Sequence, residues 1–185
     1  MLELDYSDRI VDVVEEGFDV VIRTGAATDS RLMRRSLGRF SGRIVASPEY
    51  LARRGRPATP ADLDSHACLR QRSPATGKLA DWPLIVDAAG PALIPETMSA
   101  TTIEPLVYLA EKGFGIAFLP PFAVSQQIEE GMLVPLMEEY TRETGEFAAL
   151  WPTSRHLSPR IRAFVNFLAE HLHLGGTPPV AYGSS

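Results

Sequence analysis

Cys68 and His66 are the two side chains whose types and spacing come nearest to a nucleophile and its base. Catalysis by a thiol needs a base within hydrogen-bond reach. The two residues lie at positions i and i+2 of a stretch that reads as extended, where they share a face without forming a proton-transfer geometry. We therefore expect Cys68 to be a small buried side chain.

Metal and cofactor motifs give no stronger signal. His171 and His173 fall at i and i+2 near a helix end, so they do not share a face as a metal-binding pair would. The sequence has no phosphate-binding loop, no H-E-x-x-H helix and no G-x-S-x-G turn. The "GFG" at 113–115 reads as a helix end followed by a tightly packed glycine. We expect no enzyme activity, no metal and no cofactor.

A binding site for a small anion is better supported. In open α/β sheets, ligands bind outside the carboxyl ends of strands. A helix N-terminus adds unpaired N–H groups and a positive dipole end, which favour an anion. Hydroxyls, one arginine and one aromatic ring at such places suit a small carboxylate, including an aromatic one. The candidate effector-binding residues are Arg23, Thr24, Gly25, Ser99, Ala100, Thr101, Thr102 and Phe122.

Structural roles for three of these residues stay open beside the binding role. Thr101 can simply cap a helix, since Glu104 stands at capping-box spacing from it. Arg23 can pin a loop or bridge to a carboxylate. Phe122 can belong to the core.

The elements that would position these residues alternate between strands and helices, which favours an α/β fold with mostly parallel sheets. A β-hairpin with the turn residues "DAAG" is expected between them, at 80–98. Strands are expected at 2–6, 18–23, 41–47, 67–72, 115–120, 132–137 and 146–152. Helices are expected at 8–17, 48–54, 60–63, 102–113, 122–131 and 158–172.

Composition narrows the class of protein. The chain of 185 residues is 45% hydrophobic and 22% charged, which is typical of a globular protein. Its net charge is −5 without a basic block, so this chain alone should bind nucleic acid poorly. One cysteine fits a reducing compartment. Neither a long apolar run nor a basic-then-apolar leader is visible, so we expect a cytoplasmic protein without a membrane partner.

Several stretches together resemble the effector-binding domain of LysR-type transcriptional regulators, over nearly all of residues 2–172. The first is "DRIVDVVEEGFDVVIRTG", and the second, "VASPEYLARRGRPATPADLDSHACL", is the most specific. The others are "LAEKGFGIAFLPPFAVSQQIEEGMLVPLM" and "LWPTSRHLSPRIRAFVNFLAEHL".

The resemblance implies a type II periplasmic-binding-protein-like fold, with two α/β lobes of parallel or mixed sheets flanked by helices. Lobe I would be residues 1–70 and 153–173, lobe II residues 71–152, and residues 174–185 a flexible tail. A small effector would bind in the cleft between the lobes. The loop after "DVVIR" and the loop opening the lobe II helix would supply contacts, at the residues already named.

The resemblance also implies partners. Family members form homodimers, and tetramers at full length, and they bind DNA through an N-terminal winged helix-turn-helix that this chain lacks. The first strand and helix of lobe I would be missing too, so "LELDYSD" would have no ladder partner. We expect a fragment, either shortened deliberately or started at an internal methionine. It should be marginally stable alone and should not bind DNA specifically.

Two other readings remain beside a sensor of a transcription factor. A stand-alone periplasmic-type binding protein would need an export signal. An enzyme on the same two-lobed fold would need an acid–base pair near the expected cleft, where only arginine, serine and threonine are found.

Overall fold

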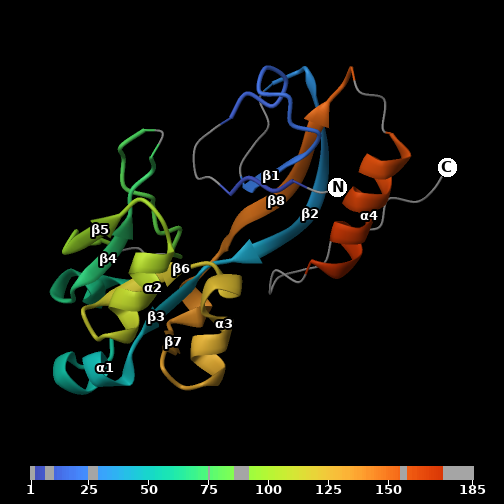
Figure 1. Cartoon of the computed structure of the whole chain (residues 1–185). Helices are drawn as coiled ribbons and strands as arrows, with labels where there is room; N and C mark the ends of the chain where they lie inside the picture. Colours follow the sequence, from blue (N-terminus) through green and yellow to red (C-terminus); the bar gives the residue numbers. More distant parts are fainter. Residues whose placement is uncertain are drawn as a thin grey trace. The chain divides into compact units, whose positions relative to one another are not determined.

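A computed structural model of the protein describes residues 3–6, 11–24, 29–74, 76–85, 92–154 and 158–172. The chain forms two compact units (Figure 1). Unit 1 consists of residues 1–10 and 42–142, and unit 2 of residues 11–41 and 143–185. Sheets flanked by helices in both units confirm the predicted α/β class. None of the helices within the described ranges is long and apolar enough to cross a membrane.

Unit 1 is built on a five-stranded sheet in the order β5-β4-β6-β3-β7. Strand β4 runs parallel to β5 and β6, whereas β3 runs antiparallel to β6 and β7. The carboxyl ends of β4, β5 and β6 therefore reach the same edge of the sheet. The elements are β3 (Arg43–Ala46), α1 (Pro48–Arg54), the 3₁₀ helix η1 (Pro60–Ser65), β4 (Cys68–Gln71), β5 (Met98–Ala100), α2 (Glu104–Glu111), β6 (Ile116–Leu119), α3 (Pro121–Glu129), β7 (Val134–Leu136) and the 3₁₀ helix η2 (Glu138–Tyr140).

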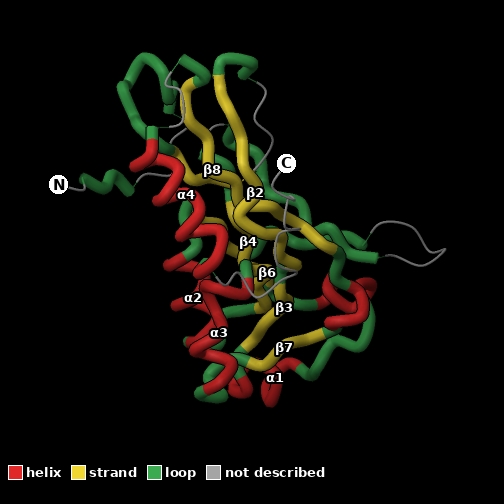
Figure 2. Tube along the Cα trace, turned by 90° about the vertical axis from the view of Figure 1, so that its right-hand side faces the viewer, coloured by secondary structure: helices red, strands yellow, loops and turns green. Residues whose placement is uncertain are grey.

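Both faces of this sheet are buried at β3 and β6, which explains why these two strands read as short apolar runs. Val45 and Ala117 pack with residues of α2 and α3, the two helices that lie together on one side of the strands in Figure 2. Ile44 and Ile116 point to the opposite face, where Trp82 belongs to their cluster. Successive residues of β3 and β6 thus supply two cores.

Unit 2 is built on three antiparallel strands in the order β1-β8-β2, with α4 packed on β2 (Figure 1). The apolar stripe of α4 buries Ile161 and Val165 against Leu37 and Trp151. The helix begins where the sequence predicts, because the Ser158 hydroxyl oxygen accepts a hydrogen bond from the backbone N–H of Ile161 at 3.3 Å. The elements are β1 (Val21–Thr24), β2 (Leu32–Ser41), β8 (Glu143–Pro152) and α4 (Pro159–His171).

Two of the three arginines of β2 are paired with acidic residues of β8, and the third, Arg35, donates to Asn166 of α4. Arg34 donates to a carboxylate oxygen of Glu146 at 2.5 Å, and Arg39 donates to Glu143 at 2.9 Å. Pairs facing each other across two strands offset each other's charge. These arginines therefore do not form a positive strip that could follow a phosphate backbone.

Local signals in the sequence place several elements correctly. Ser47 caps α1 by accepting the N–H of Tyr50 at 3.2 Å, and Gly55, with φ of 82°, ends that helix. The expected strands at 67–72 and 115–120 are confirmed as β4 and β6, and the expected helix at 122–131 is confirmed as α3.

The expected hairpin at 80–98 is wrong for the described residues. Residues 81–85 and 92–97 form no strand pair, and the turn "DAAG" lies outside the described residues. Met98 instead begins β5, which pairs in parallel with β4. Trp82 is buried in the core, so the apolar residues of this segment serve packing rather than a ladder.

The beginning of the chain also differs from the expectation. Residues 3–6 form no strand, and residues 13–17 form turns rather than the end of a helix. The Asp12 carboxylate accepts the N–H groups of Val14 and Glu15, both at 3.0 Å. Such a side chain offers the backbone an alternative to helix hydrogen bonds. The expected cap, Ser7, lies outside the described residues.

The two units do not divide where the lobes were expected to divide. Residues 43–70, expected in lobe I, lie in unit 1, because β3 and β4 pair with strands of that sheet. The chain leaves unit 2 after Ser41 and returns to it at Glu143, the ends of the long pair β2 and β8. The expected tail, 174–185, lies outside the described residues.

Candidate functional site

The predicted segment Ser99–Thr102 lies at the carboxyl edge of the sheet in unit 1. Ser99 and Ala100 end β5, and the backbone N–H of Arg72, just beyond β4, donates to the carbonyl of Ala100 at 2.8 Å. Thr101 and Thr102 follow in a bend that leads into α2. This is the edge at which ligands bind in open α/β sheets.

Helix α2 begins at Glu104, three residues after Thr101, which was its expected N-cap residue. Its N-cap is Ile103, and no side chain caps it, so the predicted capping box of Thr101 and Glu104 is wrong. Pro105 lies in the first turn, where its missing N–H costs no helix hydrogen bond. Among the described residues, the N–H groups of this turn thus have no side-chain acceptor, and the dipole of α2 makes the position favourable for an anion.

Arg72 is a charged residue of this edge that the sequence analysis missed. It forms an ion pair with Glu96 and donates to the carbonyl of Gly77 at 2.7 Å. Hydrogen bonds from Ser99 and then Arg72 lower the pKa of Glu96, so this carboxylate stays ionised at neutral pH. The signal available in the sequence was the position of Arg72 directly after the apolar strand β4.

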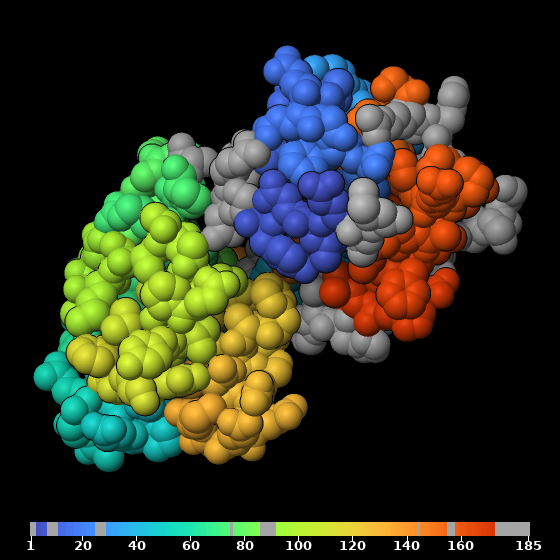
Figure 3. All heavy atoms as spheres, viewed as in Figure 1, coloured from blue at the N-terminus to red at the C-terminus, as the bar shows by residue number. Residues whose placement is uncertain are grey.

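Phe122 lies in the first turn of α3, three residues beyond the end of β6 at Leu119. It is 41% exposed, so it does not belong to the core. With Val107 and Tyr108 it lines a hollow of about 400 Å³ between α2 and α3, the yellow-green and gold elements at the front of Figure 3. Strands β5 and β6 end at the same edge of the sheet. Phe122, which comes after β6 in the sequence, therefore lies beyond the same edge as Ser99.

Arg23 and Thr24 end β1 in unit 2, where they pair with Ala148 and Phe147 of β8. No hydrogen bond or ion pair joins the Arg23 side chain to another described residue. Hydrogen bonds from Arg31 lower the pKa of Asp29, and the more distant charge of Arg23 contributes least. Within the described residues, Arg23 therefore does not bridge to a carboxylate. Gly25 lies outside the described residues.

The groups that could do covalent chemistry are buried and engaged. Burial raises the pKa of the Cys68 thiol to about 12, so the thiolate is absent at neutral pH. The Nδ1 atom of His66 lies 3.0 Å from the Tyr50 hydroxyl. No group of His, Cys, Asp and Glu side chains among the described residues could hold a metal ion.

The "GFG" stretch has the packing role that its sequence indicates. Gly113 ends α2 with φ of 71°. A Cβ at Gly115 would lie 2.6 Å from the carbonyl oxygen of Ala67, so only glycine fits between β6 and β4 there.

Comparison with known proteins decides the family. The family model described as "LysR substrate binding domain" matches residues 1–173. The chain belongs to this family. A LysR domain of this kind is the effector-binding domain of a transcriptional regulator, so the resemblance seen in the sequence is confirmed.

Individual relatives of this LysR domain are transcriptional regulators too. It is 36% identical over 172 residues to the HTH-type transcriptional regulator CrgA of Neisseria meningitidis, covering 92% of this chain and 57% of CrgA. It is 34% identical over 173 residues to the HTH-type regulator YhjC of Escherichia coli, covering 91% of this chain and 56% of YhjC. The chain thus spans a little over half the length of these relatives.

A solved structure confirms the fold. The regulatory domain of CrgA, a LysR-type transcriptional regulator, superimposes with a TM-score of 0.78 at 34% identity, covering 90% of this chain and 81% of that one. The type II periplasmic-binding-protein-like class expected for LysR effector domains is therefore confirmed. These relatives are transcriptional regulators rather than enzymes.

Proposed function

We propose that this LysR domain senses a small anionic effector through the eight residues predicted from the sequence. The N-terminal end of α2 carries this proposal, because it combines a helix dipole with two threonines at the carboxyl edge of parallel strands. Ser99 takes a supporting part, since its hydroxyl is engaged with Glu96 and thereby fixes the loop.

Unit 2 would supply a cation to the same effector. Arg23 is half-buried at the end of β1 and has no ion-pair partner among the described residues, so its guanidinium can meet a carboxylate in the bidentate way. We propose Thr24 and Gly25 as backbone and hydroxyl contacts beside it. Phe122 would offer its ring to an apolar part of the effector.

We further propose that the two units are the two lobes of the effector domain. The effector would favour one arrangement of the lobes and shift its population, because a ligand stabilises the state to which it binds more tightly. Homodimers, and tetramers of the full-length regulator, would carry this change to DNA-binding heads at the N-terminus. The cytoplasm, where the DNA is, is the compartment that this function requires.

The relatives favour this function over the alternative of a stand-alone transport-type binding protein. CrgA and YhjC are both named as HTH-type transcriptional regulators, and this chain matches them over more than nine-tenths of its length.

A thermal-shift screen of small carboxylates and phosphates against this chain would test the proposed site. We expect a hit whose stabilisation is lost in Arg23→Gln and in Thr101→Val. Thr153→Val is the matched control, because Thr153 is an exposed threonine in unit 2 whose side chain forms no hydrogen bond with another described residue. Stabilisation that survives both site substitutions would contradict the proposal.

A further inference from the structure

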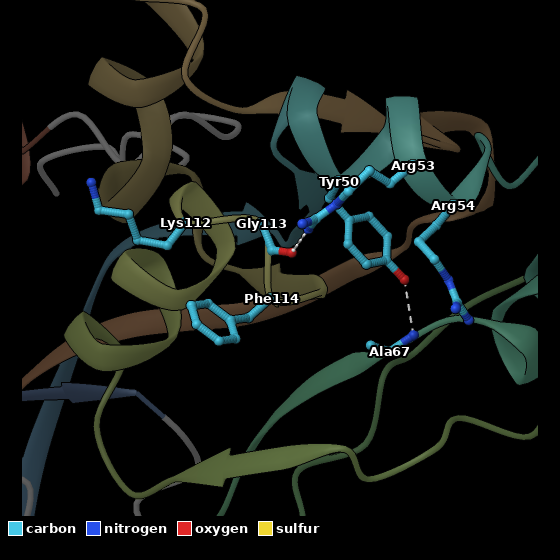
Figure 4. A pocket seen from close by; sticks show the side chains of 7 residues that line it. All are labelled: Tyr50, Arg53, Arg54, Ala67, Lys112, Gly113 and Phe114. Carbon is cyan, nitrogen blue, oxygen red and sulfur yellow. Dashed lines mark hydrogen bonds between the residues drawn. The ribbon is translucent and has the colours of Figure 1, made fainter.

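Unit 1 carries a second hollow that shares no lining residue with the proposed effector site. It has a volume of about 400 Å³ and lies where α1, the start of β4 and the turn between α2 and β6 meet (Figure 4). Its walls combine aromatic and basic side chains. Those that matter here are Tyr50, Arg53, Arg54, Lys112, Gly113 and Phe114.

Two aromatic residues line the hollow, one buried and one half-exposed. Tyr50 is 2% exposed, and its hydroxyl is engaged, since it accepts the N–H of Ala67 at 2.9 Å and contacts His66. Tyr50 is thus held in place as a buried wall of the hollow. Phe114 is 49% exposed and stands in the turn before β6. A half-exposed ring beside a fixed one leaves apolar area that a ligand can cover.

Two guanidinium groups supply the positive charge. Arg53 donates to the carbonyl of Gly113 at 2.6 Å, and Arg54 donates to the carbonyl of Ser65 at 3.1 Å. A guanidinium has five N–H donors, so these bonds orient each group and leave donors for an anion. Arg53 also meets Glu49 at 3.4 Å, in a pair whose side chains are both more than half exposed.

Carboxylates offset only part of the positive charge of the hollow. Arg54 has no carboxylate partner among the described residues. The Lys112 ammonium lies 5.5 Å from the centre of the Tyr108 ring and points away from the guanidinium groups in Figure 4. Lys112 therefore adds positive charge at a distance rather than a hydrogen bond.

Gly113 keeps the Arg53 side of the hollow open. A Cβ at this position would lie 3.1 Å from the Nη2 atom of Arg53, and the φ of 71° disfavours any other residue. The glycine thus ends α2 and also lets the guanidinium reach its carbonyl. The Arg53 contact is part of how α1 and this turn pack together.

We propose that this hollow is a second binding site, for a small organic anion with a flat apolar body. Its acidic group, a carboxylate or a phosphate, would meet Arg53 and Arg54. Its apolar body would lie against the half-exposed ring of Phe114. The combination fits because guanidinium groups recognise both kinds of acidic group through paired hydrogen bonds. The proposal does not depend on the effector site.

Titration of the whole 185-residue chain with benzoate and with phenyl phosphate tests the proposal. Amide NMR signals of Ala67 and Gly113 report on this hollow, and those of Ala100 and Thr102 on the proposed effector site. We expect saturable shifts of the first pair with at least one of the two anions, and none with neutral benzyl alcohol. The anion that binds identifies the preferred acidic group.

Variants then assign the shifts to the hollow. Arg54→Gln should weaken binding about tenfold or more, as expected for a lost charge-assisted hydrogen bond. Arg56→Gln is the matched control, because Arg56 also donates to a backbone carbonyl, that of Pro135 at 2.8 Å, but does not line the hollow. Phe114→Ala, at a half-exposed position, should weaken binding several-fold.

Three results would overturn the proposal. The first is the absence of shifts at Ala67 and Gly113 with either anion. The second is equal weakening by Arg54→Gln and Arg56→Gln. The third is binding that Arg23→Gln abolishes while Arg54→Gln and Phe114→Ala leave it unchanged, which would assign the anion to the effector site alone.

Discussion

The Tyr50 hydroxyl lies between the His66 ring and the backbone N–H of Ala67, at 3.0 and 2.9 Å. Cys68 follows directly and is fully buried. The sequence predicted a small buried role for Cys68, because its spacing from His66 excluded proton transfer, and that role is confirmed. The partner of His66 could not be predicted, since Tyr50 is sixteen residues away, in helix α1.

Acid should weaken the fold through His66. Burial, and then the charge of Arg54, lower the pKa of His66 below 6.5 in the folded state. The unfolded state therefore binds more protons, and stability should fall as the pH drops below about 6.5. We expect the urea midpoint to fall less between pH 7.5 and 5.5 in His66→Gln than in the wild type. The carboxylates with lowered pKa, such as Asp62, lose their contribution only at lower pH. Equal falls in both proteins would contradict this role.

Cys68 should be inert in the folded protein. With the pKa of its thiol raised to about 12, almost no thiolate is present at pH 8. We expect no reaction with Ellman's reagent in buffer and one thiol per chain in 6 M guanidinium chloride, which serves as the control. Rapid reaction of the folded chain would show that the thiol is accessible after all.

Among the elements, β4 is tied to two neighbouring segments by Arg70. This side chain is 7% exposed and donates to the carbonyls of Ile94 and Ala80, at 2.8 and 2.9 Å. Its guanidinium also lies 5.8 Å from the centre of the Trp82 ring. The Nε atom of Arg70 is the one buried side-chain nitrogen or oxygen without a partner in the described part of the chain. One cation thus organises the segment that was expected to be a hairpin.

Replacing Arg70 should cost stability. Arg70→Met keeps most of the length but leaves two carbonyls without their donor, so we expect the free energy of unfolding to fall by about 2–4 kcal/mol. Arg142→Met, at an exposed position, is the control and should change it by less than about 0.5 kcal/mol. Urea unfolding measures both. Similar values for the two variants would show that Arg70 does not organise this segment.

Elements with signals in neighbouring residues were predictable, and strand pairings were not. Ser47 and Pro48 start α1, and Ser158 and Pro159 start α4, as the capping rules require. By contrast, β2 pairs with β8, about a hundred residues away. Nothing local marks that pairing, so the division of the chain was expected at Arg70 instead of at Ser41. The position of candidate residues just after strand ends was predictable from the sequence, but the absence of a Thr101 cap was not.

Across the whole molecule, the outer edge of β1 is where a longer chain could add stability. Within the described residues, β1 pairs only with β8, and Ile22 is 40% exposed. An unpaired strand edge leaves backbone groups without ladder partners. The strand expected to lack a partner was 2–6, which the structure does not form, so the open edge lies at β1 instead.

An N-terminally extended version should therefore unfold at higher urea concentration. Trp151 reports on β8, and a Trp82→Phe background removes the other tryptophan signal. We expect the Trp151 fluorescence midpoint to rise on extension. Equal midpoints would mean that the edge of β1 gains nothing from the added segment.

The central claim is that this LysR domain is the sensor of a DNA-binding regulator, and the most direct measurement is the DNA sequence upstream of codon 1, read in frame. CrgA and YhjC are longer than this chain, which covers 57% and 56% of them. We expect an open reading frame that encodes a helix-turn-helix, a linker helix and a β-strand leading into Leu2. An in-frame stop close upstream would contradict it and would remove the DNA-binding role from this protein.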